Sequence, residues 1–156
     1  MSRIGFGFDT HQLDFNYDLF VGGIKIPSDK GAVGHSDADV LIHAICDALL
    51  GAANLGDIGT HFPDSDQQFK DIDSKILLKK VIALINEKNF HISNIDTTIC
   101  LEKPKIAPFI NLIRQKLSEV LGIPEYDISI KAKTSEKLGF IGREEGISAY
   151  AVVLID

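Results

Sequence analysis

The sequence predicts an α+β fold in which helices cover one face of a mixed sheet. Short apolar segments with strand character occur towards both ends of the chain and at the β-branched stretch Ile92–Leu101, and apolar residues recur every three or four positions in the segments between them. Strands and helices are mixed rather than strictly alternating. With 156 residues and 45% apolar content, the chain can bury one core but is short for two ordinary domains. We therefore expect residues 1–156 to form a single-domain sandwich with a four-stranded mixed sheet and a small hairpin.

The N-terminal third should contain a strand, the hairpin and the first helix. Arg3–Phe8 has the length and apolar content of a strand, and Leu19–Pro27 should form a hairpin that turns on two glycines. We expect a loop at Gly31–Gly34, followed by Ser36 as the N-cap of a helix with Asp39 three residues on. From Asp37 to about Ala53, the apolar residues repeat with helical spacing.

The remaining elements are predicted from residues that break helices and strands and from the spacing of apolar residues. Glycine and proline make residues 54–66 a loop, and Gly122 should end the third long helix. The expected helices are Asp73–Lys88 and Pro104–Leu121, and the expected strands are Ile92–Leu101, Asp127–Lys133 and Ile147–Ile155.

The net charge limits the classes of binding partner, and the cysteines indicate the cellular compartment. A net charge of -6 argues against nucleic acid or a membrane surface as partner, because both are bound through clustered cations. Cys46 and Cys100 form no CxxC pair and lie in segments with a buried pattern, as expected in a reducing cytoplasm. No signal-peptide pattern occurs at the start of the chain. A plastid-type organelle would be the alternative location if a targeting extension had been removed.

Asp9-Thr10-His11 is the first candidate metal site. Residues two apart on an extended chain point the same way, and carboxylate oxygen and imidazole nitrogen are both zinc ligands. The alternative is a turn aspartate beside a surface histidine. His43 is the second candidate, since Asp39 or Asp47, one turn away, could orient its ring. Two histidines and a carboxylate would leave the fourth zinc position open for a substrate or water.

Three further segments carry groups suited to an anionic ligand. Residues 34–37 precede a helix N-terminus, where free N–H groups favour a phosphate. Residues 56–66 are rich in carboxylates that could accept from polyol hydroxyls, and residues 131–143 combine cations and hydroxyls with Glu136, a ligand for Mg²⁺. A capping loop, a solvated loop and surface charge are the respective alternatives.

Taken in order, these motifs resemble those of the 2-C-methyl-D-erythritol 2,4-cyclodiphosphate synthase family of the non-mevalonate isoprenoid pathway. The matching stretches span nearly the whole chain: Ile4–His11, Gly22–Pro27, His35–Val40 through His43, Asp47–Ala53, Leu55–Gly59, Phe62–Asp64, and Thr134–Phe140 with Gly142-Arg143.

The resemblance implies a role for each matching residue. It implies that Asp9, His11 and His43 bind zinc, that His35 and Thr134 stabilise the transition state, and that Glu136 helps to hold Mg²⁺ or Mn²⁺. The residues that it implies contact the erythritol and phosphate part are Asp9, His11, His35, Ser36, Asp57, Ile58, Gly59, Phe62, Pro63, Asp64, Ser65 and Asp66. Those implied for the cytidine and diphosphate part are Leu101, Pro104, Lys105, Ile106, Ala107, Lys133, Thr134, Ser135, Glu136, Phe140 and Arg143.

The resemblance also implies a reaction and an assembly. The 2-phosphate of 4-diphosphocytidyl-2-C-methyl-D-erythritol 2-phosphate would attack the β-phosphorus, close a cyclic diphosphate and expel CMP. The enzyme would be a monofunctional homotrimer with active sites between subunits, and Arg143 could instead serve the trimer axis, where the family can bind an anionic isoprenoid diphosphate. The sequence departs from the family pattern at Lys133, Ser135 and Ile141, which affects only the diphosphate pocket. A zinc phosphohydrolase and a non-catalytic metal or nucleotide binder remain alternatives.

Overall fold

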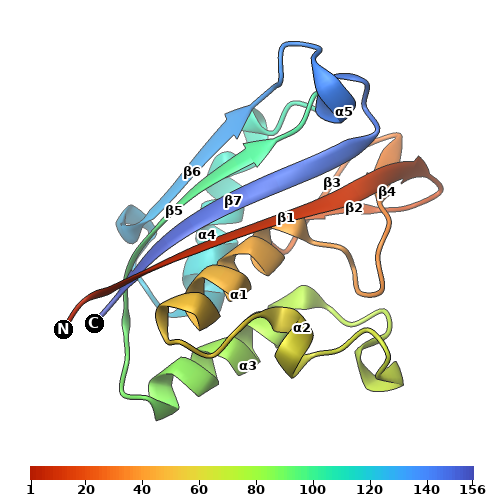
Figure 1. The fold of residues 1–156 in the computed structure, drawn as a ribbon. Coiled ribbons are helices and arrows are strands. Elements are labelled where there is room, and N and C mark those ends of the chain that lie inside the picture. The colour runs from red at the N-terminus through yellow and green to blue at the C-terminus, as the bar shows by residue number, and fades with distance from the viewer.

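A computed structural model describes residues 1–156 as a curved sheet with helices packed on one side (Figure 1). The strands are β1 (Arg3–Phe15), β2 (Leu19–Val21), β3 (Ile24–Ile26), β4 (Lys30–Ala32), β5 (Ile92–Cys100), β6 (Ile128–Lys133) and β7 (Gly146–Ile155). The α-helices are α1 (Val40–Ala52), α2 (Ile58–His61), α3 (Ser74–Glu87), α4 (Ile110–Leu121) and α5 (Gly139–Gly142). Short 3₁₀ turns occupy Gln67–Phe69, Ala107–Phe109 and Glu125–Asp127.

The main sheet has five strands, in the order β4-β1-β7-β5-β6, so the expectation of four strands was wrong. Only β5 and β6 pair in parallel, and β2 and β3 form the separate hairpin expected around Gly22 and Gly23. The extra strand, β4, lies in the predicted loop at residues 31–34 and pairs with Leu13–Phe15. β1 runs seven residues past the predicted end at Phe8, and this extension provides the edge to which a strand too short to show periodicity can pair.

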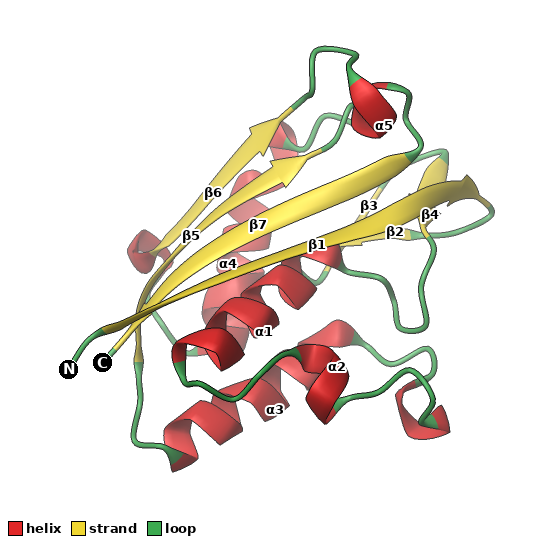
Figure 2. Ribbon diagram, viewed as in Figure 1, coloured by secondary structure: helices red, strands yellow, loops and turns green.

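The helices cover one face of the sheet, as expected (Figure 2). α1 packs under β1 and β7, and α3 lies on the far side of α1 from the sheet. Because α1 is covered by both the sheet and α3, it is buried nearly all round rather than along a single stripe. The helix that carries His43 is therefore the most enclosed element of the fold.

Two glycines in β1 allow α1 to lie unusually close to the sheet. A Cβ atom on Gly5 would collide with the carbonyl oxygen of Ala48, and one on Gly7 with that of Ala44. Glycine is required where backbones approach this closely. The close approach places the N-terminal half of α1 against the part of β1 that carries Asp9.

The start of α1 differs from the prediction, because Asp39 rather than Ser36 is the N-cap. Its carboxylate accepts hydrogen bonds from the N–H of Ile42 at 3.0 Å, of Gly22 at 2.9 Å and of Gly23 at 2.6 Å. Complete burial raises the pKa of Asp39, against the effect of these donors. Asp39 thus joins the hairpin turn to the helix, a long-range role that local spacing does not reveal.

Other boundaries were close to the predictions, with identifiable exceptions. α3 begins one residue after the predicted start at Asp73, which is its N-cap, and Gly122 ends α4 as expected, in the left-handed conformation. α4 starts at Ile110 rather than Pro104, because a 3₁₀ turn precedes it. The single-turn helices α2 and α5 lie in segments expected to be loops. No helix in the structure combines the length and apolarity that crossing a membrane would require.

Candidate metal centre and active site

The side chains of Asp9, His11 and His43 converge on one point. Asp9 Oδ2 lies 2.8 Å from His11 Nε2 and 3.0 Å from His43 Nδ1, and the two histidine nitrogens are 3.2 Å apart. Asp9 and His11 lie on the helix-facing side of β1, since alternate residues of a strand share a face. His43 reaches them from the first turns of α1. The convergence that spacing alone could not establish is therefore present.

The tautomer of His11 suits metal binding. Its Nδ1 lies 3.0 Å from the carbonyl oxygen of Val33, which can only accept, so Nδ1 carries the proton and donates it. Nε2 points at Asp9 and His43; without a metal a second proton there can donate to Asp9, and a bound cation would replace that proton and take the Nε2 lone pair. Gly34 gives the ring room, because a Cβ there would lie 3.2 Å from His11 Cε1.

The electrostatics of the cluster keep Asp9 ionised. Burial raises the pKa of its carboxyl group, but hydrogen bonds and charge from His11 and His43 outweigh burial and lower the pKa to about 2. The same contact raises the pKa of His11, against the opposing effect of burial. An anionic oxygen and two imidazole nitrogens, with one ligand atom from each residue within 4.8 Å of the others, fit a divalent cation such as zinc.

A cavity of about 520 Å³ opens beside this cluster. Its wall includes many of the side chains predicted for the erythritol and phosphate part, namely Asp9, His11, His35, Ser36, Ile58, Gly59, Phe62, Pro63 and Asp64, together with His43. His35 is half-buried there, and its Nε2 is buried without a hydrogen-bond partner. A buried ring nitrogen left unpaired is a site at which a ligand oxygen can be recognised.

Comparison with known proteins decides the family. The family model described as the YgbB family matches residues 2–156. The chain belongs to the YgbB family. A Bacteroides fragilis relative named 2-C-methyl-D-erythritol 2,4-cyclodiphosphate synthase is 62% identical over 154 residues, which cover 99% of this chain and 97% of the relative. The resemblance to the 2-C-methyl-D-erythritol 2,4-cyclodiphosphate synthase family, inferred from the sequence motifs, is confirmed.

Solved structures of the YgbB type share the fold. A CDP-bound 2C-methyl-D-erythritol-2,4-cyclodiphosphate synthase matches with a TM-score of 0.92 and 36% identity, over 99% of this chain and all of that one. The bifunctional IspDF of Campylobacter jejuni matches with a TM-score of 0.96 and 40% identity. This chain is 99% covered in that match and spans 42% of the bifunctional protein.

The loop that follows α1 is anchored by carboxylates. Asp47 Oδ1 accepts from the N–H of Ile58 at 2.8 Å, which fixes the start of α2, and burial raises the pKa of Asp47. Asp57 caps α2 by accepting from Thr60, and Asp66 caps the next 3₁₀ turn. Asp57, Ser65 and Asp66 therefore flank the cavity without lining it.

The residues predicted for the cytidine and diphosphate part lie elsewhere in this chain. None of them lines the cavity beside His43. They follow the carboxyl ends of the parallel strands β5 and β6, where the N–H of Leu101 donates to the carbonyl of Lys133 at 2.9 Å. Leu101 and Ile106 are buried, whereas Pro104 is half-buried and Lys105 and Ala107 are exposed. Within one chain the predicted site thus falls into two parts, of which only one lines this cavity.

The loop between β6 and α5 is held mostly by local contacts. Thr134 Oγ1 donates to Glu136 Oε1 at 3.2 Å, and Ser135 Oγ donates to the carbonyl of Leu138 at 2.6 Å. Glu136 is exposed and has a positive φ of 54°. Its carboxylate is open to a hard cation, which proteins commonly bind through one or two carboxylates together with substrate phosphates.

Two more of the predicted residues lie beyond that loop. Phe140 is exposed on α5. Arg143 makes a paired contact with Glu145, with nitrogen–oxygen distances of 3.0 and 3.1 Å. An anion approaching Arg143 must therefore compete with this carboxylate.

The prediction that Asp39 or Asp47 orients the ring of His43 was wrong, because both carboxylates accept from backbone N–H groups. His43 Nε2 instead lies 2.9 Å from Ser74 Oγ and 3.2 Å from Ser36 Oγ. Ser74 was not singled out by the sequence, in which it is only the second residue of the predicted helix Asp73–Lys88. Its spatial partners lie more than thirty residues away along the chain, and no local pattern records them.

Proposed function

We propose that this protein is a 2-C-methyl-D-erythritol 2,4-cyclodiphosphate synthase, which cyclises 4-diphosphocytidyl-2-C-methyl-D-erythritol 2-phosphate and releases CMP. The observation that carries the proposal is the convergence of Asp9, His11 and His43 beside a cavity of about 520 Å³, in a chain 62% identical to a relative of that name. The reaction breaks a phosphorus–oxygen bond without adding water, which makes the enzyme a lyase.

The nucleophile needs little help from the protein. A phosphate monoester is already ionised near neutral pH, so no general base is required to activate it. The enzyme must instead fold the substrate onto itself and offset its negative charge. A chain with a net charge of -6 can do this only through bound cations and a few local donors.

We assign zinc to Asp9, His11 and His43, because one carboxylate and two imidazoles leave the fourth tetrahedral position open. A zinc ion held there would act as a Lewis acid on the β-phosphate. His11 presents its Nε2 lone pair because Val33 holds the proton on Nδ1. His35, with its unpaired buried nitrogen, would bind a phosphoryl oxygen as charge develops.

We assign Glu136 to a Mg²⁺ or Mn²⁺ ion shared with the substrate diphosphate. Such an ion would stabilise the leaving CMP. Thr134, whose hydroxyl contacts Glu136, would stabilise the same charge as a hydrogen-bond donor. Residues 57–59 and 62–66 would contact the erythritol and phosphate part, and residues 101–107 and 133–136 the cytidine and diphosphate part.

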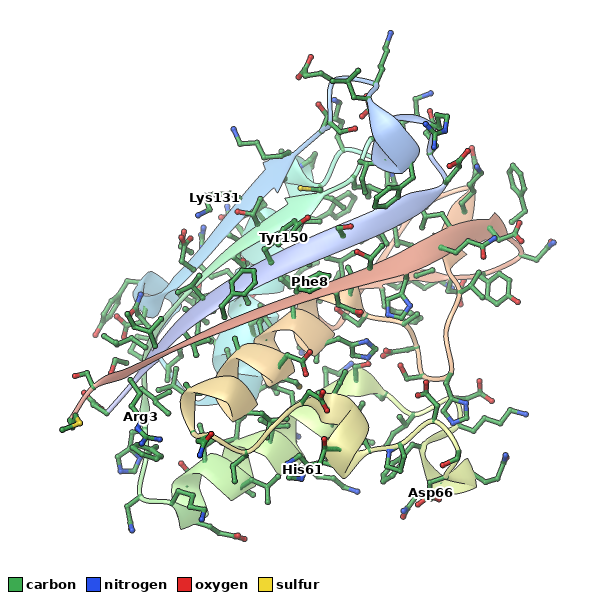
Figure 3. The ribbon with its side chains drawn as sticks, viewed as in Figure 1. Arg3, Phe8, His61, Asp66, Lys131 and Tyr150 are labelled. Carbon is green, nitrogen blue, oxygen red and sulfur yellow. The ribbon has the colours of Figure 1, made fainter.

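We propose a homotrimer in which the two parts of the site come from neighbouring subunits. The separation of these parts within one chain supports this arrangement. So does the sheet face opposite the helices, where Phe8 and Tyr150 stack with ring centroids 6.3 Å apart (Figure 3). Ile4, Phe6 and Phe8 are 73%, 61% and 58% exposed on that face, and a contiguous apolar surface of this kind marks an interface.

The assembly proposal extends to location and to a second ligand. Arg143 would bind an isoprenoid diphosphate at the trimer axis once its contact with Glu145 is broken. The bacterial relatives and the thiols of Cys46 and Cys100 support a cytoplasmic location. We propose that residues 1–156 act as one synthase domain.

Phosphorus NMR of the protein with substrate and Mg²⁺ tests the reaction. We expect the cyclic diphosphate and CMP, and loss of both products in His43→Ala and in chelator-treated protein. A linear phosphate product would indicate a hydrolase. No turnover in folded, metal-loaded protein would refute the enzymatic proposal.

Light scattering of Phe6→Glu tests the assembly. The substitution places a charge on the exposed apolar face, where burial against another subunit would be costly. We expect a monomer that still binds zinc but has lost turnover. A fully active monomer would contradict a site shared between subunits.

A further inference from the structure

Both ring nitrogens of His43 are engaged, and on opposite sides. Nδ1 faces Asp9 Oδ2 at 3.0 Å and His11 Nε2 at 3.2 Å, whereas Nε2 faces Ser74 Oγ at 2.9 Å. A neutral imidazole carries one proton, so a lone pair on Nδ1 requires the proton on Nε2. The ability of His43 to act as a ligand therefore depends on what Nε2 contacts.

The direction of the contact between Ser74 and His43 is set by a third residue. Ser74 Oγ donates its only proton to Asp37 Oδ1, and the backbone N–H of Ser74 donates to Asp37 Oδ2 at 2.9 Å. The carboxylate can only accept. Because the Ser74 proton is committed to Asp37, its oxygen must accept from His43 Nε2–H.

This arrangement is enclosed, and the helix cap does not require it. Ser74 has no exposed surface, and His43 is only 7% exposed, so water cannot readily replace the contact. α3 is already capped by Asp73, which accepts from the N–H of Lys75 at 2.9 Å. The hydroxyl of Ser74 is therefore free of the capping role common for serine at a helix start.

Ser36 Oγ is a weaker partner for the same nitrogen. It lies 3.2 Å from His43 Nε2 and accepts from the N–H of Ala38 at 3.2 Å. Its own proton is not committed to a carboxylate, so Ser36 could equally donate to the ring. Only Ser74 fixes the direction of the hydrogen bond.

We propose that Ser74, oriented by Asp37, is a positioning residue that holds the proton of His43 on Nε2 and so keeps the Nδ1 lone pair directed at the metal. The inference rests on the metal assignment made under the proposed function and adds two residues to it. Removing a partner of this kind typically weakens metal affinity roughly 10- to 100-fold.

The test compares zinc affinity in wild type, Ser74→Ala, Ser118→Ala and His43→Ala, and the exchange of the His43 Nε2 proton in the variants that keep His43. Ser118 is the matched control, because its hydroxyl also makes a hydrogen bond from a helix, to Ile123 at 2.6 Å, but lies outside the site. Competition with a chromophoric chelator gives the zinc Kd. Nitrogen NMR of histidine-labelled, zinc-loaded protein gives the solvent exchange rate of the His43 Nε2 proton, and thermal unfolding checks the fold.

We expect the Nε2 proton of His43 to exchange slowly in zinc-loaded wild type, and Ser74→Ala to lose this protection and to bind zinc roughly 10- to 100-fold more weakly. Ser118→Ala should match wild type in both readouts. An Nε2 proton that exchanges equally fast in wild type and Ser74→Ala would overturn the inference. An unchanged zinc Kd in Ser74→Ala, together with loss of zinc binding in His43→Ala, would also overturn the inference. The metal assignment would stand in that case. Unchanged binding in His43→Ala would instead refute the metal assignment itself, and the inference with it.

Discussion

The two parts of the predicted site are built differently. Around Asp9, His11 and His43, contacts join segments that lie far apart in the chain: β1, the segment before α1, α1 itself and the start of α3. Around Thr134 and Glu136, most side-chain contacts join residues two or three positions apart. His43 is 7% exposed, whereas Glu136 lies on the surface.

This difference supports the proposal that the metal part is organised within one chain, whereas the part proposed for the nucleotide is completed by a ligand or a second chain. Long-range buried contacts restrict side chains before a ligand arrives, and such preorganisation is what metal ligands require. An exposed loop with local contacts can adjust to a substrate, which is where functional loops commonly lie. Substitutions in the two parts should therefore have separable effects on zinc affinity and on turnover.

The largest effect should come from Asp9→Asn. The substitution preserves shape but removes the charge that holds both histidines, so we expect loss of zinc binding and a fall in activity of roughly 10³-fold, as for removal of several kcal/mol of charge stabilisation. Zinc titration and turnover measure both. Asp14→Asn is the control, because Asp14 lies on the same strand but is exposed. Retention of tight zinc binding in Asp9→Asn would remove Asp9 from the ligand set.

Glu136→Gln should affect turnover without affecting zinc. Its carboxylate lies in the other part of the site, so we expect activity to fall about 10²-fold while the zinc Kd and the melting temperature stay unchanged. Glu125→Gln, an exposed substitution away from both parts, should behave as wild type. A weakened zinc Kd in Glu136→Gln would show that the two parts are coupled, contrary to the comparison drawn above.

A smaller effect is expected at Asp47, which anchors the loop on the metal side. Asp47→Ala removes the acceptor for the N–H of Ile58, and losing a hydrogen bond to a charged group corresponds to about a tenfold rise in KM. The zinc Kd should not change. Asp47→Asn keeps an acceptor oxygen and should restore most of the affinity for substrate. A KM in Asp47→Ala equal to that of wild type would show that the loop is positioned by other contacts.

Local patterns predicted the elements that are long and periodic, and missed those that depend on neighbours. α3, β5, β6 and β7 lie close to their predicted bounds, and α4 ends where predicted, because each is long enough to show a clear apolar period. β4 was missed because three residues show no alternation and because its pairing depends on the extension of β1. The N-cap of α1 is Asp39 rather than the predicted Ser36. Asp39 also binds the hairpin turn, and a rule based on local spacing contains no such contact.

The sequence by itself determined the fold class, the family, and the identity of the three candidate metal ligands. The family rests on motif order along the whole chain, and the ligand types rest on the chemistry of carboxylate and imidazole. Only the tertiary structure decided that Val33 orients His11, that Ser74, held by Asp37, faces His43, and that the residues predicted for the cytidine and diphosphate part lie outside the cavity beside His43. The reason is physical: these contacts join residues that are distant in the chain, and close packing of α1 on Gly5 and Gly7 brings them together.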